Sequence, residues 1–456
     1  MPPGAPPMAG MDMSAPAAPA TPPILKAAPA AAPTPGDMPG MAKDGSAPMP
    51  GMQMSGMSGD LGAYPMTRDA SGTSWQPDSS PMEGQMGRLG GWSTMVEGYA
   101  TLDYDNQGGP RGGDKTFVES MFMLMAQHPL GGGTLTLRGM GSLDPLMGKS
   151  GYPLLLGTGE TANGRTALVD RQHPHDAVME LAAVYSHDLA AQTSGLLSSG
   201  FVYVGWAGEP ALGPVTFMHR FSGEANPEAP IDHHWLDSTH ITFGVATVGL
   251  TRGPFKLEAS SFTGREPNQN RWDFDHPRFD SWSTRLTYNP TADLSFQVST
   301  GWLHSPEQLE PEVSQKRTTA SGTYNLPLKT VLFGRSLSGN WQSTAAWGRD
   351  QNEPGHTLDA YLLESAATLG RHSLFGRVEN ADKDELFDDD PTSPNYRRIF
   401  NVSKISVGYY YTTPLSRLLA LDVGGLVSKY DLPSSLTSTY GPDPTSFMLF
   451  TRVWIR

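Results

Sequence analysis

The chain has 456 residues, which is enough for one large domain or two to three ordinary ones. Its formal net charge of -14 argues against nucleic acid, or an anionic membrane surface, as a partner. The chain has no cysteine, which excludes disulfides and thiolate metal sites, so any soft-metal chemistry must use methionine and histidine. With 51 Gly, 15 Tyr and 10 Trp but only 17% charged residues, the composition is typical of a sheet protein with aromatic girdles.

The first 90 residues contain little that could pack a core. Repeats such as "PPGAPPMAG" and "AAPAAAPTPG" bury too little apolar surface to offset the entropy lost on ordering, so residues 1–90 are predicted to be a disordered, partly polyproline-like tail. The start "MPPGAPPMAG" lacks the charged and apolar regions of a signal peptide, and no stretch approaches the roughly 20 apolar residues of a membrane-spanning helix.

Methionine is concentrated in this tail, where 13 of the 22 methionines lie. Thioethers are soft ligands that select Cu(I), and spacings of two or three residues let a flexible chain wrap several sulfurs around one ion. The alternative is a biased linker in which methionine is incidental. The methionines predicted to bind copper are those of "GMDMS" and "PMPGMQMSGMSGD": Met11, Met13, Met49, Met52, Met54 and Met57.

From Trp92 the pattern changes to short segments that alternate between apolar and polar residues, the period of a β-strand. The segment lengths cluster around the 9 to 11 residues that cross an outer membrane at a tilt. We predict about sixteen strands, near 92–104, 115–127, 133–143, 178–188, 199–206, 239–249, 254–264, 281–288, 294–303, 316–325, 338–347, 358–368, 372–380, 400–412, 417–428 and 445–455.

The connections between these strands support one architecture. Tight turns such as "NPTAD" mostly alternate with long polar loops at 144–177, 207–238, 265–280, 381–399 and 429–444. Short periplasmic turns and long extracellular loops are typical of outer-membrane barrels. Residues 91–456 are therefore predicted to form an all-β, closed antiparallel transmembrane barrel of about 16 strands, located in the outer membrane of a Gram-negative bacterium. The segment 326–337 fits this pattern worst, because it is too long for a tight turn.

Two strands are predicted to carry a row of methionines on the lumen face. In "KTFVESMFMLMAQ" the polar side of the alternation marks the interior, and the next strand continues it. Such a row could relay a soft cation, or methionine could simply fill a narrow barrel. The residues concerned are Met121, Met123, Met125 and Met140.

Ten of the twelve histidines lie between residues 128 and 304, most of them in or beside the two longest loops. We expect those loops to fold inward and meet, because exposed aromatic residues would otherwise remain in water. Their imidazoles must then be satisfied by carboxylates or by a metal ion. The candidate ligands are His173, His175, Asp176, His219, His233, His234, Asp237 and His240; His240 is expected on the lumen face of strand 239–249.

A Met-rich disordered start followed by an outer-membrane barrel resembles the copper resistance protein B family of Gram-negative bacteria. The resemblance rests on residues 1–66 in composition and on 92–456 in strand pattern. It implies copper sequestration, resistance or export, with Cu(I) as the bound metal, outer-membrane lipid around the barrel and periplasmic copper proteins as partners.

Two other functions remain open from the sequence. One is a porin or channel for a small solute, with the His-rich loops at its constriction. The other is a barrel-embedded hydrolase using a histidine, an acid and Ser222 or Ser238, although no catalytic sequence motif is present.

Overall fold

The computed structural model describes residues 57–189, 196–332 and 334–456. Sixteen strands pair in antiparallel order around a ring, and the ring closes where β19 pairs with β2, as in the register Leu449 to Tyr104. The ring strands are β2 (Trp92–Gln107), β3 (Gly113–Leu130), β4 (Gly133–Gly141), β7 (Val178–Asp188), β8 (Ser198–Gly208), β9 (Thr242–Arg252), β10 (Phe255–Phe262), β11 (Ser281–Thr291), β12 (Leu294–Leu303), β13 (Ser314–Leu332), β14 (Arg335–Glu353), β15 (Thr357–Leu369), β16 (His372–Lys383), β17 (Phe400–Pro414), β18 (Leu419–Asp431) and β19 (Thr445–Ile455).

The remaining elements are short. Strand β1 (Gln85–Leu89) pairs with β2, and β5 (Tyr152–Thr161) pairs with β6 (Ala167–Gln172) inside a loop. The helical turns are η1 (Met66–Arg68), η2 (Asp144–Met147), η3 (Phe217–His219), α1 (Phe221–Glu224), α2 (His233–Leu236), η4 (Ser238–His240), η5 (Ser434–Leu436) and α3 (Thr437–Tyr440). None of these described helices has the length and apolarity needed to cross a membrane.

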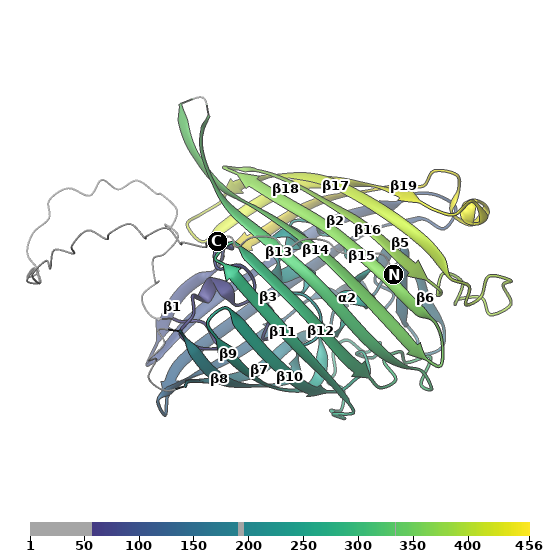
Figure 1. Ribbon diagram of the computed structural model, residues 1–456. Coiled ribbons are helices and arrows are strands. Elements are labelled where there is room, and N and C mark those ends of the chain that lie inside the picture. The colour runs from purple at the N-terminus through teal and green to yellow at the C-terminus, as the bar shows by residue number, and fades with distance from the viewer. Residues whose placement is uncertain (1–56, 190–195, 333) are drawn as a thin grey trace, which may run out of the picture. The chain divides into compact units, whose positions relative to one another are not determined.

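The sixteen predicted strands correspond to the sixteen strands of the ring, which confirms the predicted fold class. The segment 326–337 fitted poorly because β13 and β14 continue through it. Their pairing runs to Leu332 opposite Arg335, and the hairpin extends beyond its neighbours (Figure 1).

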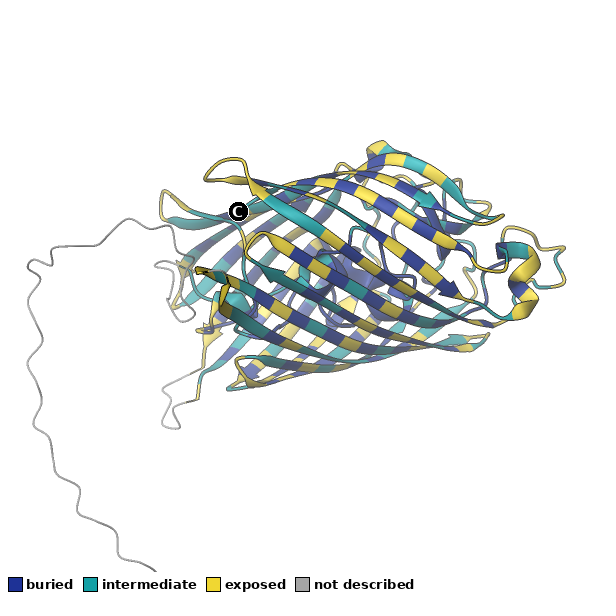
Figure 2. Cartoon of the chain, turned by 90° about the horizontal axis from the view of Figure 1, so that it is seen from above, coloured by how far each residue is buried: buried dark blue, intermediate teal, exposed yellow. Residues whose placement is uncertain are grey.

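The two faces of the wall differ in chemistry. In β10, Phe255 and Leu257 are exposed on the outside, whereas Lys256 and Glu258 are buried inside. The same alternation bands the strands around the barrel (Figure 2). A continuous outer belt of exposed Leu, Val, Phe and Tyr is costly in water but favourable in lipid, and closure gives every ring strand two neighbours. The chain is therefore an outer-membrane β-barrel.

The two ends of the barrel differ in their connections. At one end, here the short-turn end, hairpins connect strands through two residues at 131–132, 253–254, 292–293 and 370–371. At the opposite, long-loop end the connections include 263–280, 304–313, 384–399 and 432–444. By the usual asymmetry of such barrels, the short-turn end faces the periplasm.

Residues 57–84, here the N-terminal segment, lie inside the barrel at its short-turn end. Asp60 accepts a hydrogen bond from Thr136 of β4 (3.0 Å) and pairs with Arg138 (3.3 Å). The Tyr64 hydroxyl bonds Thr251 of β9 (3.1 Å). The sequence prediction of a tail reaching residue 90 is corrected here, because this stretch packs and bonds to the wall; residues 1–56 lie outside the described part.

Further contacts hold the same segment across the barrel. Arg285 of β11 donates to Ser74 (2.8 Å), and Asn325 of β13 donates to the carbonyl of Ser79 (2.7 Å). Trp75 is buried, with the Lys256 ammonium 5.1 Å from its ring. The N-terminal segment therefore narrows one end of the lumen.

Two long connections narrow the other end. Residues 142–177, here the first inner loop, contain η2, β5 and β6, and residues 209–241, here the second inner loop, contain η3, α1, α2 and η4. Their side chains join a buried core with the wall: Leu154 and Leu156 of β5 and Phe217 of η3 pack with Phe375 and Phe450 of the wall. Both loops therefore fold inward, as the sequence predicts.

Candidate functional site

The two inner loops bring five imidazoles into one row. The His173 and His234 ring centres are 6.2 Å apart, and those of His234 and His233 are 5.6 Å apart. The row continues from His233 to His240 at 5.1 Å and from His240 to His175 at 5.4 Å. The predicted convergence of the two loops is thus confirmed, and we call these five residues the imidazole row.

Asp237 organises the row from within the second inner loop. The single turn of α2 places His233 one turn before Asp237, and the two side chains bond at 2.6 Å. The other carboxylate oxygen accepts the Phe217 backbone N–H (3.0 Å) and pairs with Arg220 (2.9 Å). Burial would raise the pKa of Asp237, but the bond to His233 and the charge of Arg220 lower it.

His240 differs from its predicted position. It lies in η4, just before β9 begins at Thr242, rather than on a strand from 239. The tight turn lets His240 Nδ1 donate to the backbone carbonyl of Asp237 (2.8 Å). One aspartate therefore orients two imidazoles of the row.

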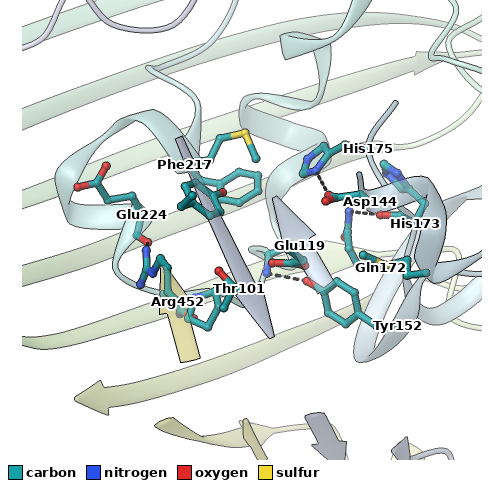
Figure 3. A pocket seen from close by; sticks show the side chains of 16 residues that line it. Thr101, Glu119, Asp144, Tyr152, Gln172, His173, His175, Phe217, Glu224 and Arg452 are labelled. Carbon is teal, nitrogen blue, oxygen red and sulfur yellow. Dashed lines mark hydrogen bonds and ion pairs between the residues drawn. The ribbon is translucent and has the colours of Figure 1, made fainter. Parts of the chain in front are cut away.

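The first inner loop orients the other members. His175 Nδ1 bonds Asp144 of η2 at 2.8 Å, as Figure 3 shows. His173 Nε2 lies 3.3 Å from Glu160 of β5. Asp176, a predicted ligand, pairs with Arg271 at 3.0 Å.

Burial makes the imidazoles poor bases. It lowers the pKa of His173 to about 3, with the neighbouring His233 and His175 adding to the effect. Burial likewise lowers the pKa of His233, His234 and His240. A lowered pKa favours the neutral form, in which imidazole donates a lone pair to a metal ion.

His219 stands apart from the row. Among the described residues, no ring contact joins His219 to the five imidazoles. The charged groups that affect its pKa are Glu180, Arg138 and His175. Burial lowers its pKa to about 4. Its Nε2 atom, like that of His234 and of His240, is buried without a hydrogen-bond partner in the described structure.

A cavity separates the inner loops from the wall formed by β2, β3 and β19. Its volume is about 30 Å³, room for about two or three water molecules at roughly 10–15 Å³ each. Tyr99, Glu119 and Arg452 line it from the wall, and His175 and Phe217 line it from the loops (Figure 3). The lumen is thus almost filled at this level.

The cavity lining carries more acids than bases. Glu119, Asp144 and Glu224 line it, against the single cation Arg452, which donates to the Glu224 carbonyl at 2.8 Å. Burial raises the pKa of Glu224 to about 7. Behind this lining, Asp103 of β2 has two buried carboxylate oxygens without partners.

The methionine predictions divide between described and undescribed residues. Met11, Met13, Met49, Met52 and Met54 lie outside the described residues. Met57 begins the described chain at the short-turn end, where Ser58 bonds Gln127.

The wall methionines face the lumen as predicted. Met121, Met125 and Met140 are buried there, Met123 is half-buried, and the strand register pairs Met123 with Met140.

The serines considered for hydrolysis are engaged elsewhere. Ser222 Oγ bonds Thr344 (2.8 Å) and Glu364 (3.0 Å) of the wall, and Ser238 Oγ accepts from Arg317 (2.9 Å). Neither hydroxyl is bonded to an imidazole in the described structure, so no nucleophile and base pair is formed.

Several site residues were not found from the sequence. Asp144, Glu160, Glu266 and Glu307 meet the histidines only in three dimensions, because each comes from a different part of the loops. The "DHHWLD" spacing was a usable signal for His233 and Asp237, since residues four apart face each other on a helical turn.

No protein-family model matches the sequence, and no curated protein matches it significantly. Solved barrels do match in structure. OprB of Pseudomonas putida has 9% identity and a TM-score of 0.48, covering 80% of this chain and 94% of its own.

An anion-selective porin from Comamonas acidovorans has 12% identity and a TM-score of 0.45, covering 79% of this chain and 99% of its own. The outer membrane channel DcaP of Acinetobacter baumannii has 10% identity and a TM-score of 0.42, covering 82% and 100%.

Proposed function

We propose that the protein is an outer-membrane channel for small cations, with its constriction formed by the two inner loops. The observation that carries the proposal is the cavity between those loops and the wall, which has three acidic side chains and one cation in its lining. A sixteen-strand barrel is wide enough for an aqueous pathway unless something fills it. Here the N-terminal segment fills the short-turn end and the two inner loops fill the other end, and the loops can move while the wall stays intact.

The electrostatics of the lining favour positive solutes. A narrow, low-dielectric passage lined by one sign of charge concentrates ions of the opposite sign. Several buried cations of the wall are paired with carboxylates. Arg138 pairs with Glu180 at 2.5 Å, Arg285 shares Glu258 with Lys256, and Arg377 shares Glu364 with Arg220. The acids of the cavity outnumber its one cation, so the passage attracts cations once water enters beside the displaced loops and the carboxyl groups ionise; in the closed arrangement burial holds the pKa of Glu224 at about 7.

The cavity size limits which solutes can pass through the closed barrel. Space for two or three waters admits no organic solute, so passage of anything larger requires displacement of the inner loops. We therefore expect low conductance from the closed arrangement and higher conductance when the loops move.

The proposal is tested by recording from the purified full chain in planar bilayers across a tenfold KCl gradient. A reversal potential of the sign that favours K⁺ is expected. The double variant Glu119→Gln, Glu224→Gln should move it toward zero, whereas Glu312→Gln, an exposed change in the 304–313 loop, should not. Preference for chloride, or no conductance at any pH, would overturn the proposal.

Copper handling is a second candidate. In this proposal the Met-rich tail captures Cu(I), and the lumen methionines Met121, Met125 and Met140 and the neutral imidazoles offer further soft or intermediate ligands. Periplasmic copper proteins would then exchange copper with the tail.

The copper proposal predicts Cu(I) or Ag(I) binding by the full chain through thioethers. Changing Met49, Met52, Met54 and Met57 together to Leu keeps size but removes four sulfurs. Weaker Ag(I) binding with unaltered Zn(II) binding would support the proposal, and unaltered Ag(I) affinity would refute it.

A further inference from the structure

His234, the second member of the imidazole row, meets two carboxylates from other loops. His234 Nδ1 lies 3.5 Å from Glu266 Oε1 and 3.8 Å from Glu307 Oε1. Glu266 belongs to the β10–β11 connection and Glu307 to the β12–β13 connection. One donor atom from each of the three residues lies within 4.8 Å of the other two.

These separations suit ligands of one ion better than direct hydrogen bonds. Bonds of about 2.0–2.2 Å at tetrahedral angles place neighbouring ligand atoms about 3.3–3.6 Å apart. A direct hydrogen bond would draw the nitrogen and oxygen to about 2.7–3.2 Å. The observed 3.5 and 3.8 Å are too long for the second arrangement and close to the first.

Unsatisfied atoms point to the same conclusion. Glu266 is 7% exposed, and its Oε2 has no hydrogen-bond partner in the described structure. Glu266 is buried and the Glu307 side chain is 23% exposed, and two carboxylates this close repel each other unless they share a proton or a cation.

The nearby cations are already engaged. Arg317 pairs with Asp350 at 3.0 Å, and Arg265 donates to the Ser305 carbonyl at 2.7 Å. Lys383 bonds Thr158 at 3.3 Å. None of these three bridges the two glutamates in the described structure, so the pair lacks a direct cationic partner.

The surrounding backbone holds the three side chains in place. The Glu266 N–H donates to the Pro306 carbonyl (3.0 Å), which ties the two glutamate loops together. Glu307 Oε2 accepts the Glu160 N–H (3.3 Å), which leaves Oε1 toward His234. Gly159 has a φ of +97°, and a Cβ there would lie 2.5 Å from the His234 ring, so glycine makes room for the imidazole.

We propose that His234, Glu266 and Glu307 form a binding site for a divalent transition-metal cation of the Zn²⁺ class, which clamps the second inner loop to the two neighbouring loops. One imidazole nitrogen with carboxylate oxygens, and no sulfur, selects intermediate divalent ions over Cu(I). Solvent completes the coordination. The effect of such a clamp on conductance rests on the proposed channel function, whereas the binding itself does not.

The test is calorimetric titration of the chelator-treated full chain in detergent with Zn²⁺. Glu266→Gln and Glu307→Gln keep the side-chain shape and should each weaken Zn²⁺ binding about tenfold or more. Glu312→Gln removes an equal charge from the 304–313 loop and should leave the affinity unchanged. Heat-modifiable migration on gels verifies that each variant retains the barrel.

X-ray absorption at the zinc edge provides an independent measurement. Nitrogen and oxygen neighbours at about 2.0–2.2 Å are expected. Wild-type affinity in both glutamine variants, or sulfur in the zinc shell, would overturn the site. Conductance is measured separately, so zinc binding without any current change would leave the site standing and count against the channel.

Discussion

The lumen is filled from both ends, but the two fillings differ in how completely their polar groups are satisfied. The N-terminal segment meets the wall through paired groups, such as Asp60 with Arg138 and Asn325 with Ser79, and leaves two buried side-chain atoms, Arg68 Nη1 and Trp75 Nε1, without a partner in the described structure. The inner loops bury His234, His240 and Asp232 with atoms that have no partner in the described structure. Buried polar groups are normally satisfied, and exceptions concentrate where binding or movement occurs. We therefore infer that the N-terminal segment anchors to the wall and that the inner loops bind or move during function.

The largest effect on conductance is expected from removing the Asp237 carboxylate, which bonds both His233 and Arg220 in the second inner loop. Asp237→Ala leaves Arg220 without one of its two carboxylates and His233 without its bond. Breaking a buried pair costs about 3–5 kcal/mol, which should release the second inner loop while the wall persists. Bilayer conductance should rise, and protease should cut within 209–241. Asp273→Ala, at an exposed loop position, is the control; equal conductance in both variants would contradict the assignment.

The N-terminal segment should respond differently to a core truncation. Leu61 is buried against Tyr64, Trp75 and Phe201, so Leu61→Ala should cost about 2–5 kcal/mol through lost packing. Urea unfolding in lipid vesicles measures this loss. Cation selectivity should stay at the wild-type value, because the cavity lining lies elsewhere. A changed reversal potential would show that the two fillings are not separable in this way.

Acid is expected to favour opening of the inner loops, because a buried imidazole binds a proton more readily once the loop has opened. Burial lowers the pKa of His173 from 6.5 to about 3, so an opened loop binds more protons than the closed one between those values. This imidazole therefore favours opening as the pH falls below about 6.5. Glu266, whose pKa burial raises to about 7, shifts the balance in the opposite direction.

Comparing wild type with His173→Gln isolates the imidazole contribution. The variant should show a weaker rise of conductance on acidification from pH 6.5 toward 4, because one titrating group has been removed. Identical pH profiles would show that His173 does not couple protons to the loops.

The smallest effect is expected from one hydroxyl of the N-terminal segment. Tyr64→Phe removes the bonds to Thr251 and to the Leu197 carbonyl, both 3.1 Å, and should cost about 1 kcal/mol. Conductance should not change. A current increase as large as that of Asp237→Ala would show that the N-terminal segment also controls the lumen, against the anchoring role assigned to it.

The barrel could be predicted from the sequence because residues facing lipid alternate with residues facing the lumen along each wall strand. In β3, Val118, Phe122 and Leu124 face outward and Met121 and Met125 face inward, as the alternation predicts. The alternation predicts the β13–β14 hairpin but not its length, because it assigns residues 326–337 to the connection between the two strands.

The interior could be predicted only in part. Residues 57–84 share the Pro and Ser content of the tail, and only Leu61, Tyr64 and Trp75 distinguish them as a packed segment. Long loops with His and aromatic residues indicated convergence, but Glu266 and Glu307 lie far from His234 in sequence. Local patterns carry no information about such contacts.

Loop movement can be tested directly because the chain has no cysteine of its own. The hydroxyls of Ser222 in the second inner loop and Thr344 in β14 are 2.8 Å apart, so Ser222→Cys with Thr344→Cys places two thiols where a disulfide can form. Single-channel conductance of this double variant is recorded at pH 5 before and after adding reductant. If the inner loops control the lumen, the current is small while the disulfide holds the second inner loop to the wall, and a larger, cation-selective current appears once the disulfide is reduced. Equal currents in the oxidised and reduced protein would contradict the claim that the inner loops control the lumen.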